Sequence, residues 1–204
     1  ANRSFTLNPK VSNLVPAIDA ATHQLILIKD ANIQLADDQL GELVANLTPG
    51  TGMVCAIPIA VRPQTFWAEV EAAEMNGRSA PHMMGASVIG LNVGFGKVML
   101  FDRDDYNRVD GVSVMSGTFG DDHALAKALQ RIGKRTVFAA SNIRQAMGAR
   151  GFRALWDRQL RWMVIRRDEA PLVFFAEAFF GCLSTTLLGV AGFVSLGMPV
   201  LPVA

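Results

Sequence analysis

The chain has 204 residues, half of them hydrophobic, and a formal net charge of +1. This length suits one domain with its own core, or one domain joined to a membrane segment, and the near-neutral charge argues against a nucleic-acid-binding protein. The two cysteines lie far apart and have no metal-type spacing, which favours a reducing environment such as the cytosol.

The first half of the chain alternates between predicted helices and strands. Asn8-Pro9-Lys10 opens a helix, because proline is well tolerated in a first helical turn, and apolar residues then recur at helical spacing as far as Ile18. The segments that follow are predicted as a strand over 24–29, a helix over 37–47, a strand over 53–61, a helix over 65–75, a loop over 77–81 and a strand over 88–101.

The next predicted elements are a short helix over 104–109, a helix over 121–132 and a strand over 135–140. Alternation of strands and helices is typical of an α/β fold with a mostly parallel sheet. We therefore predict an α/β core over residues 1–150.

An arginine-rich amphipathic helix is predicted over 151–167, within a segment that we bound at 151–170. It carries the motif R-x-x-R-W, formed by Arg158, Arg161 and Trp162. A helix of this kind favours the membrane interface, where tryptophan lies among the headgroups and arginine reaches phosphates. Membrane anchoring alone and phosphate binding at an active site are both open interpretations of the motif.

From Leu172 to about Val194 the chain is almost wholly apolar. We expect a transmembrane or membrane-inserted helix within 171–204, because roughly 20 apolar residues cross a bilayer. A helix in a soluble core is the alternative, since Glu177 would be costly in lipid.

Acidic residues stand at the ends of two predicted elements. Asp30 and Asn32 follow a strand, where open α/β sheets bind ligands, and their oxygens suit a Mg or Mn ion that bridges a diphosphate. An ordinary turn is the alternative. Asp121 and Asp122 open a helix, so one can cap it while the other takes a proton from an attacking hydroxyl; capping alone is the alternative.

Lys10 and His82 are further candidates. Lys10 precedes a predicted helix and can reach a diphosphate, and a solvated lysine is the alternative interpretation. His82 lies in a predicted loop and can bind a phosphate or a sugar hydroxyl, and a surface histidine is the alternative.

In their order along the chain, these motifs resemble the ceramide glucosyltransferase family, with its bacterial lipid and hopanoid relatives. The matching segments are N-P-K-V-S-N-L from Asn8, D-A-N from Asp30, P-H at 81–82, G-K-V-M-L from Gly96, D-D-H-A-L-A-K-A-L from Asp121 and R-x-x-R-W from Arg158. The resemblance implies a GT-A-like fold followed by an interfacial helix and a transmembrane segment. It implies inverting transfer of a hexose, most simply glucose, from a UDP-sugar to a lipid hydroxyl, most simply that of ceramide. The reaction would take place at the cytoplasmic face of a membrane.

The resemblance also implies roles for individual residues. Asp122 would be the catalytic base, and Asp30, with Asn32 beside it, would bind the divalent metal and the diphosphate. The other residues implied to bind the nucleotide sugar or its diphosphate are Lys10, His82, Arg158, Arg161 and Trp162.

Three positions depart from the family pattern: Asp121 replaces a glutamate, His123 replaces an aromatic residue and Asn32 replaces a second acid. The family's N-terminal membrane helix and first acidic strand have no counterpart here, so we expect a truncated chain with little activity by itself. Two other functions stay open. One is a non-catalytic protein of the same fold, and the other is a polysaccharide synthase, whose Q-x-x-R-W motif is related.

Overall fold

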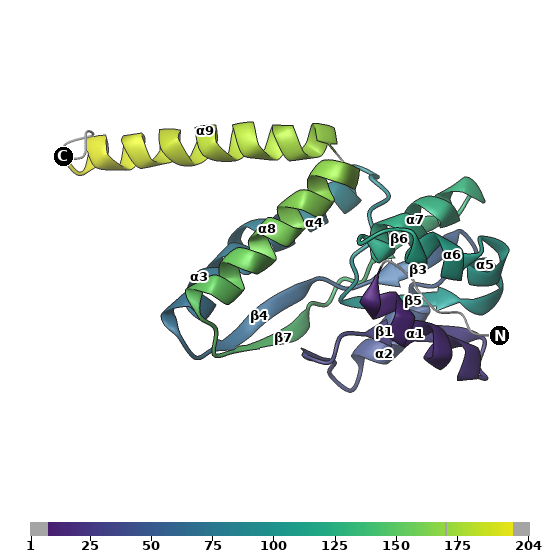
Figure 1. Ribbon diagram of the computed structural model, residues 1–204. Coiled ribbons are helices and arrows are strands. Elements are labelled where there is room, and N and C mark those ends of the chain that lie inside the picture. Colours follow the sequence, from purple (N-terminus) through teal and green to yellow (C-terminus); the bar gives the residue numbers. More distant parts are fainter. Residues whose placement is uncertain (1–7, 170, 198–204) are drawn as a thin grey trace. The chain divides into compact units, whose positions relative to one another are not determined.

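The computed structural model describes residues 8–169 and 171–197. The chain divides into two compact units, Ala1–Leu155 and Trp156–Ala204, and each is described by itself. The first unit contains two β-sheets and most of the helices (Figure 1). The second contains most of α8 (Phe152–Glu169) and all of α9 (Pro171–Ser195).

The two sheets of the first unit are both mixed. The larger has the order β1-β5-β3-β6 and the smaller β2-β7-β4. The strands are β1 (Leu25–Lys29), β2 (Ile33–Gln34), β3 (Thr51–Cys55), β4 (Pro58–Pro63), β5 (Val98–Asp102), β6 (Arg135–Phe138) and β7 (Ile143–Gly148). Pairs β3–β6 and β4–β7 are parallel, whereas β1–β5, β3–β5 and β2–β7 are antiparallel.

The α/β class is therefore confirmed, but the prediction of a mostly parallel sheet was wrong. Alternating strands and helices give a parallel sheet only when each helix returns the chain to the end of the same sheet at which the previous strand began. Here the predicted strand over 53–61 is two strands, because β3 ends at Cys55 and β4 enters the smaller sheet. The chain then returns to the larger sheet as β5, which runs antiparallel to β3.

The larger sheet has a hydrophobic core on each face, because successive residues of a strand point to opposite sides. Met53 and Phe101 face a core that includes residues of α1 (Pro9–Ala20), α5 (Arg103–Arg108), α6 (Gly111–Ser116) and α7 (Asp121–Arg131). Val54 and Leu100 face the opposite core, which includes Leu43 of α2 (Gln39–Ala45). The alternation of β3 and β5 therefore places α1 and α7 on the same side of the sheet.

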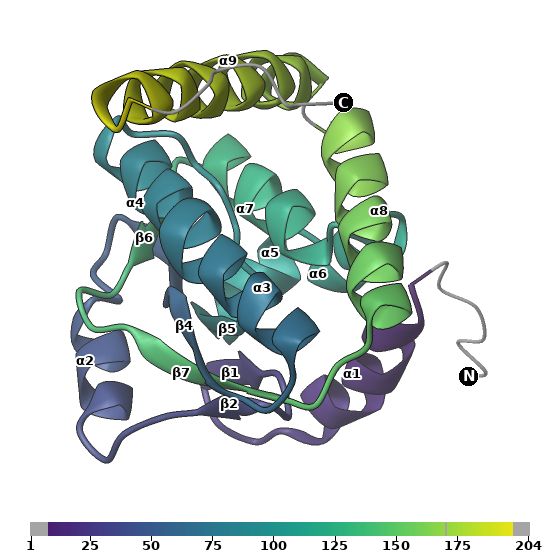
Figure 2. The same cartoon turned by 90° about the vertical axis from the view of Figure 1, so that its left-hand side faces the viewer.

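A continuous helical segment comprises α3 (Phe66–Glu74), the π-helix η1 (Met75–Ser79) and α4 (Ala80–Val88). Its first part, α3 and η1, packs on the smaller sheet, and Figure 2 shows α3 across β4 and β7, whereas α4 contacts β6 of the larger sheet. The expected loop over 77–81 and the expected strand start at residue 88 were thus both wrong. The side chain of Asn76 accepts from Ala60 N at 2.8 Å and donates to Ala60 O at 3.1 Å, which holds the π turn against β4.

The expected membrane-spanning segment, 172–194, falls within α9. Among the residues that the structure describes, no helix combines the length and the apolar character needed to cross a membrane. The prediction of a transmembrane helix is therefore unsupported. The side chain of Glu177 lies outside the described residues.

Candidate active site

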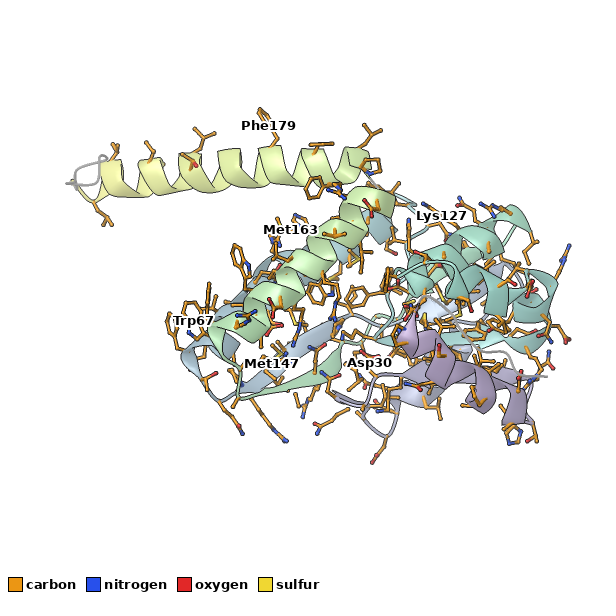
Figure 3. The ribbon with its side chains drawn as sticks, viewed as in Figure 1. Asp30, Trp67, Lys127, Met147, Met163 and Phe179 are labelled. Atoms are coloured by element: carbon orange, nitrogen blue, oxygen red, sulfur yellow. The ribbon has the colours of Figure 1, made fainter. Side chains whose placement is uncertain are left out.

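Five charged side chains gather near the starts of α1 and α7, the end of β1 and the loop before β5. They are Lys10, Asp30, Lys97, Asp121 and Asp122, which we call the charged cluster. Lys10 Nζ lies 2.8 Å from Asp121 Oδ2, and Lys97 Nζ lies 2.8 Å from Asp30 Oδ2. Asp30 is labelled in Figure 3, directly after β1. The two pairs lie within electrostatic reach of each other, because Asp30 also acts on the pKa of Lys10.

Asn8 holds the start of α1 against the start of α7. Its side-chain oxygen caps α1 by accepting from Lys10 N at 3.0 Å. Its amide group donates to Thr118 O at 3.2 Å and to Asp121 Oδ1 at 3.3 Å. The Asn-Pro-Lys motif therefore both opens a helix and carries the lysine to its carboxylate partner, 111 positions along the chain.

Lys10 is held as a cation. Burial alone would lower its pKa, but the negative charges of Asp121, Asp122 and Asp30 outweigh burial and raise the pKa above its ordinary value. Lys10 Nζ also donates to Gly96 O at 3.3 Å. A positive charge is thus maintained beside the two adjacent aspartates at neutral pH.

Asp122 is a carboxylate with a strongly perturbed pKa. Burial and the neighbouring charge of Asp121 raise the pKa of Asp122 from 3.8 to about 6, against the opposing effects of Lys10 and of backbone N–H donors. Those donors are Gly96 N, 2.6 Å from Oδ2, and His123 N, 2.9 Å from Oδ1. An oriented carboxylate with a pKa near the working pH is suited to accept a proton from a hydroxyl.

The glycines before β5 allow the loop to lie against α7. A Cβ at Gly94 would overlap the backbone carbonyl of Asp122, which cannot move without distorting α7. A Cβ at Gly96 would lie 2.9 Å from Lys10 Nζ and 3.2 Å from Asp122 Oδ2. The segment Gly94-Phe95-Gly96 thus positions the N–H group that orients Asp122.

We expect Gly94→Ala to destabilise the protein by about 2 kcal/mol, within the range for overpacking a well-packed site. Urea unfolding of the purified variant measures this free energy. Gly85→Ala is the matched control, because a Cβ there meets nothing within 4 Å and alanine favours the helix α4. Equal stability of Gly94→Ala and the parent would show that the loop does not pack against α7 as closely as described.

The structure brings together three of the residues predicted from sequence: Lys10, Asp30 and Asp122. Asn32 lies in the turn between β1 and β2, where its backbone oxygen accepts from Ala146 N at 3.1 Å, and His82 is exposed on α4 rather than in a loop. Neither takes part in the contacts that form the charged cluster.

The motif residues Arg158, Arg161 and Trp162 lie on α8, in the second unit. Sequence reasoning missed Lys97 and the ion pair of Asp121. The sequence feature that could have indicated Lys97 is its position directly after Gly94-Phe95-Gly96 and directly before the apolar segment that forms β5.

Asp30 does not fit a resident metal ion as the residues lie. Its Oδ2 already accepts Lys97 Nζ at 2.8 Å. A divalent ion about 4 Å from this ammonium would be repelled by on the order of 8 kcal/mol at an effective dielectric constant of about 20. Among the side chains that the structure describes, no group of three or more from His, Cys, Asp or Glu could hold a metal. The expected Mg or Mn site therefore lacks a ready set of ligands.

The fold matches that of a solved glycosyltransferase. A mannosyltransferase from Pyrobaculum calidifontis, PcManGT, solved with GDP-Man and Mn²⁺, superposes with a TM-score of 0.50 at 23% identity, over 83% of this chain and 43% of that one. At this identity the similarity shows the fold alone, which is that of the GT-A-like α/β glycosyltransferases.

The chain belongs to glycosyl transferase family 21, whose sequence model matches residues 1–203. It is similar to ceramide glucosyltransferase 1 of Caenorhabditis elegans, with 23% identity over 193 residues, and to ceramide glucosyltransferase 3 of the same organism, with 20% identity over 184 residues. These alignments cover 94% and 89% of this chain but only 41% and 40% of the relatives. The resemblance to the ceramide glucosyltransferase family is thereby confirmed, for a chain about two fifths as long as these relatives.

Proposed function

We propose that this chain carries the catalytic core of an inverting glycosyltransferase that moves a hexose from a UDP-sugar to a lipid hydroxyl. Family membership supports sugar transfer. The observation that carries the proposal is Asp122, a carboxylate oriented by Gly96 N–H, with a pKa raised to about 6 and a cation, Lys10, nearby. Glucose and ceramide are the proposed substrates, after the names of the two relatives.

In the proposed reaction, the acceptor hydroxyl oxygen attacks the anomeric carbon of the sugar from the side opposite the diphosphate. A bond forms between that oxygen and the anomeric carbon while the bond from the carbon to the phosphate oxygen breaks, so the configuration inverts. The proton of the hydroxyl passes to the Asp122 carboxylate, and UDP leaves with the bonding electron pair. Lys10 stabilises negative charge on the diphosphate side.

The remaining predicted residues have roles within the same proposal. Arg158, Arg161 and Trp162 stay predictions as residues that bind the donor diphosphate, a group for which the planar guanidinium of arginine is well suited. His82 and Asn32 stay predictions as donor-site residues.

An exposed aromatic cluster supports a lipid acceptor. Phe66, Trp67 and Phe152 form a chain of ring contacts with centroids 5.0 and 4.9 Å apart, and their side chains are 66%, 36% and 52% exposed. Figure 3 labels Trp67 at the start of α3. Exposed tryptophan and phenylalanine favour the interface between water and lipid. We therefore propose that the reaction takes place at a membrane surface. That this surface faces the cytoplasm stays a prediction.

The test is UDP release by the protein as its gene encodes it, in detergent, with several UDP-sugars and with ceramide, diacylglycerol or a hopanoid as acceptor. We expect release that depends on the acceptor and is fastest with UDP-glucose and ceramide. Chain elongation of a sugar acceptor without lipid would instead favour a polysaccharide synthase. If the folded protein binds UDP but releases none with any combination of UDP-sugar and acceptor, the non-catalytic function is correct.

A further inference from the structure

The positively charged ammonium group of Lys97 lies beside Asp30, where the metal ion was expected. Its Nζ lies 2.8 Å from Asp30 Oδ2, and the two side chains are only 20% and 29% exposed. The main chains are joined as well, because Asp30 N donates to Lys97 O at 3.1 Å. A main-chain bond and an ion pair together fix the ammonium at the end of β1.

A second acid also interacts with Lys97. Glu71 of α3 is fully buried, and the charge of Lys97 opposes the rise that burial causes in the pKa of Glu71. The charge of Lys97 therefore acts on the carboxyl group of Asp30, which directly follows β1, and on that of Glu71 in α3. Its positive charge is part of the folded site before any donor binds.

The glycine loop connects Lys97 to the proposed base. Gly96 immediately precedes Lys97, and Gly96 N donates to Asp122 Oδ2 while Gly96 O accepts from Lys10 Nζ. One short segment thus links two lysines and the carboxylate. An anionic group bound by Lys97 would lie next to the residues assigned to sugar transfer.

We propose that Lys97 binds the diphosphate of the nucleotide-sugar donor and supplies the positive charge that a divalent metal would otherwise provide at Asp30. This inference rests on the proposed function. On donor binding, a phosphate oxygen replaces Asp30 Oδ2 as the partner of the ammonium, as lysine binds phosphate in other nucleotide sites. When the bond to the anomeric carbon breaks, Lys97 stabilises the charge gained by the departing UDP, and no metal is required for that step.

The test is calorimetric titration of UDP into the protein as its gene encodes it, first in EDTA and then in Mn²⁺, together with UDP release under both conditions. We expect the parent to bind UDP and turn over in EDTA. Lys97→Met should weaken UDP binding in EDTA at least about tenfold, the effect of losing one charged hydrogen bond. Lys97→Arg should keep most of the affinity, and the control Lys127→Met, on the exposed side of α7, should keep all of it.

Two results would overturn the proposal while leaving the transferase function intact: turnover by the parent that requires Mn²⁺ or Mg²⁺, or unchanged UDP affinity in folded Lys97→Met. If Mn²⁺ restores UDP binding by Lys97→Met, the proposal is supported, because a metal ion could then occupy the place beside Asp30 that the ammonium group has left. Absence of UDP binding and turnover in the folded parent, with and without metal, would reject the proposed function and this inference together.

Discussion

Asp122→Asn is expected to lower kcat/KM for sugar transfer by about 10²- to 10⁴-fold, the usual contribution of a general base. Asparagine keeps the shape of the side chain but cannot accept the proton of the attacking hydroxyl. UDP release in the presence of lipid acceptor measures the effect. Asp104→Asn is the matched control, because Asp104 is also an aspartate in the first turn of a helix but is exposed on α5.

The same assignment predicts the pH dependence of the parent. Because the base must be unprotonated, kcat/KM should rise with pH through a midpoint near 6, the raised pKa of Asp122, and level off above about 7. A profile with its acidic midpoint near 4, the ordinary value for aspartate, would contradict the described environment of Asp122.

Stability provides an independent check on Asp122. Its folded pKa is raised from 3.8 to about 6, so the charged form is disfavoured in the folded state and stability falls as pH rises between these values. Asp122→Asn removes a penalty of about 3 kcal/mol and weakens one hydrogen bond worth about 1 kcal/mol. The variant should therefore be more stable than the parent by about 2 kcal/mol at pH 7.5, and the gain should vanish near pH 3. A less stable variant at pH 7.5 would mean that the bond from Gly96 N outweighs the burial of charge.

Arg150→Ala is expected to destabilise the first unit by about 3–5 kcal/mol at pH 8, because it leaves a buried carboxylate without its arginine. Glu71 is 0% exposed and Arg150 is 13% exposed, with Nε 3.3 Å from Glu71 Oε2. Arg150 Nε also donates to Met147 O at 3.1 Å, so the arginine joins α3 to the end of β7. Urea unfolding at fixed pH measures the loss.

The loss caused by Arg150→Ala should depend on pH in a definite direction. Burial raises the pKa of Glu71, and Arg150 counteracts that rise. Without Arg150 the pKa rises further, so folded Glu71 takes up a proton more readily and the loss shrinks as the pH falls. Adding Glu71→Gln should recover part of the stability at pH 8, and Arg144→Ala, an exposed arginine on β7, should change it by less than about 0.5 kcal/mol. A loss independent of pH would show that packing, rather than charge, accounts for the role of Arg150.

The sequence was most informative where local rules decide the structure. The helix that begins at Asp121 follows from its acidic first turn and its apolar spacing, and α1 follows from Asn8 and Pro9 as cap and first-turn residues. The order of motifs from Asn8 to R-x-x-R-W was enough to indicate the family. Asp30 and Asp122 were recognised as candidates because each stands at the end of a predicted element.

Sequence reasoning was least reliable where an element depends on distant partners. The π-helix depends on Asn76 reaching back to Ala60, and its glycine at position 77 reads locally as a loop. The short strand β2 forms only because β7 lies beside it. Neither partner can be inferred from the periodicity of a short window.

The sequence by itself determined which segments become helices and strands over most of the core, and which family the chain resembles. Only the tertiary structure decided the strand directions, because the chain leaves one sheet through β4 and returns through β5. It alone also decided the ion pairs of the charged cluster, since Lys10 meets Asp121 across 111 positions and Lys97 meets Asp30 across 67. The physical reason is that periodicity and capping act within a few helical turns, whereas these ion pairs form only when packing brings elements that are distant in sequence next to one another.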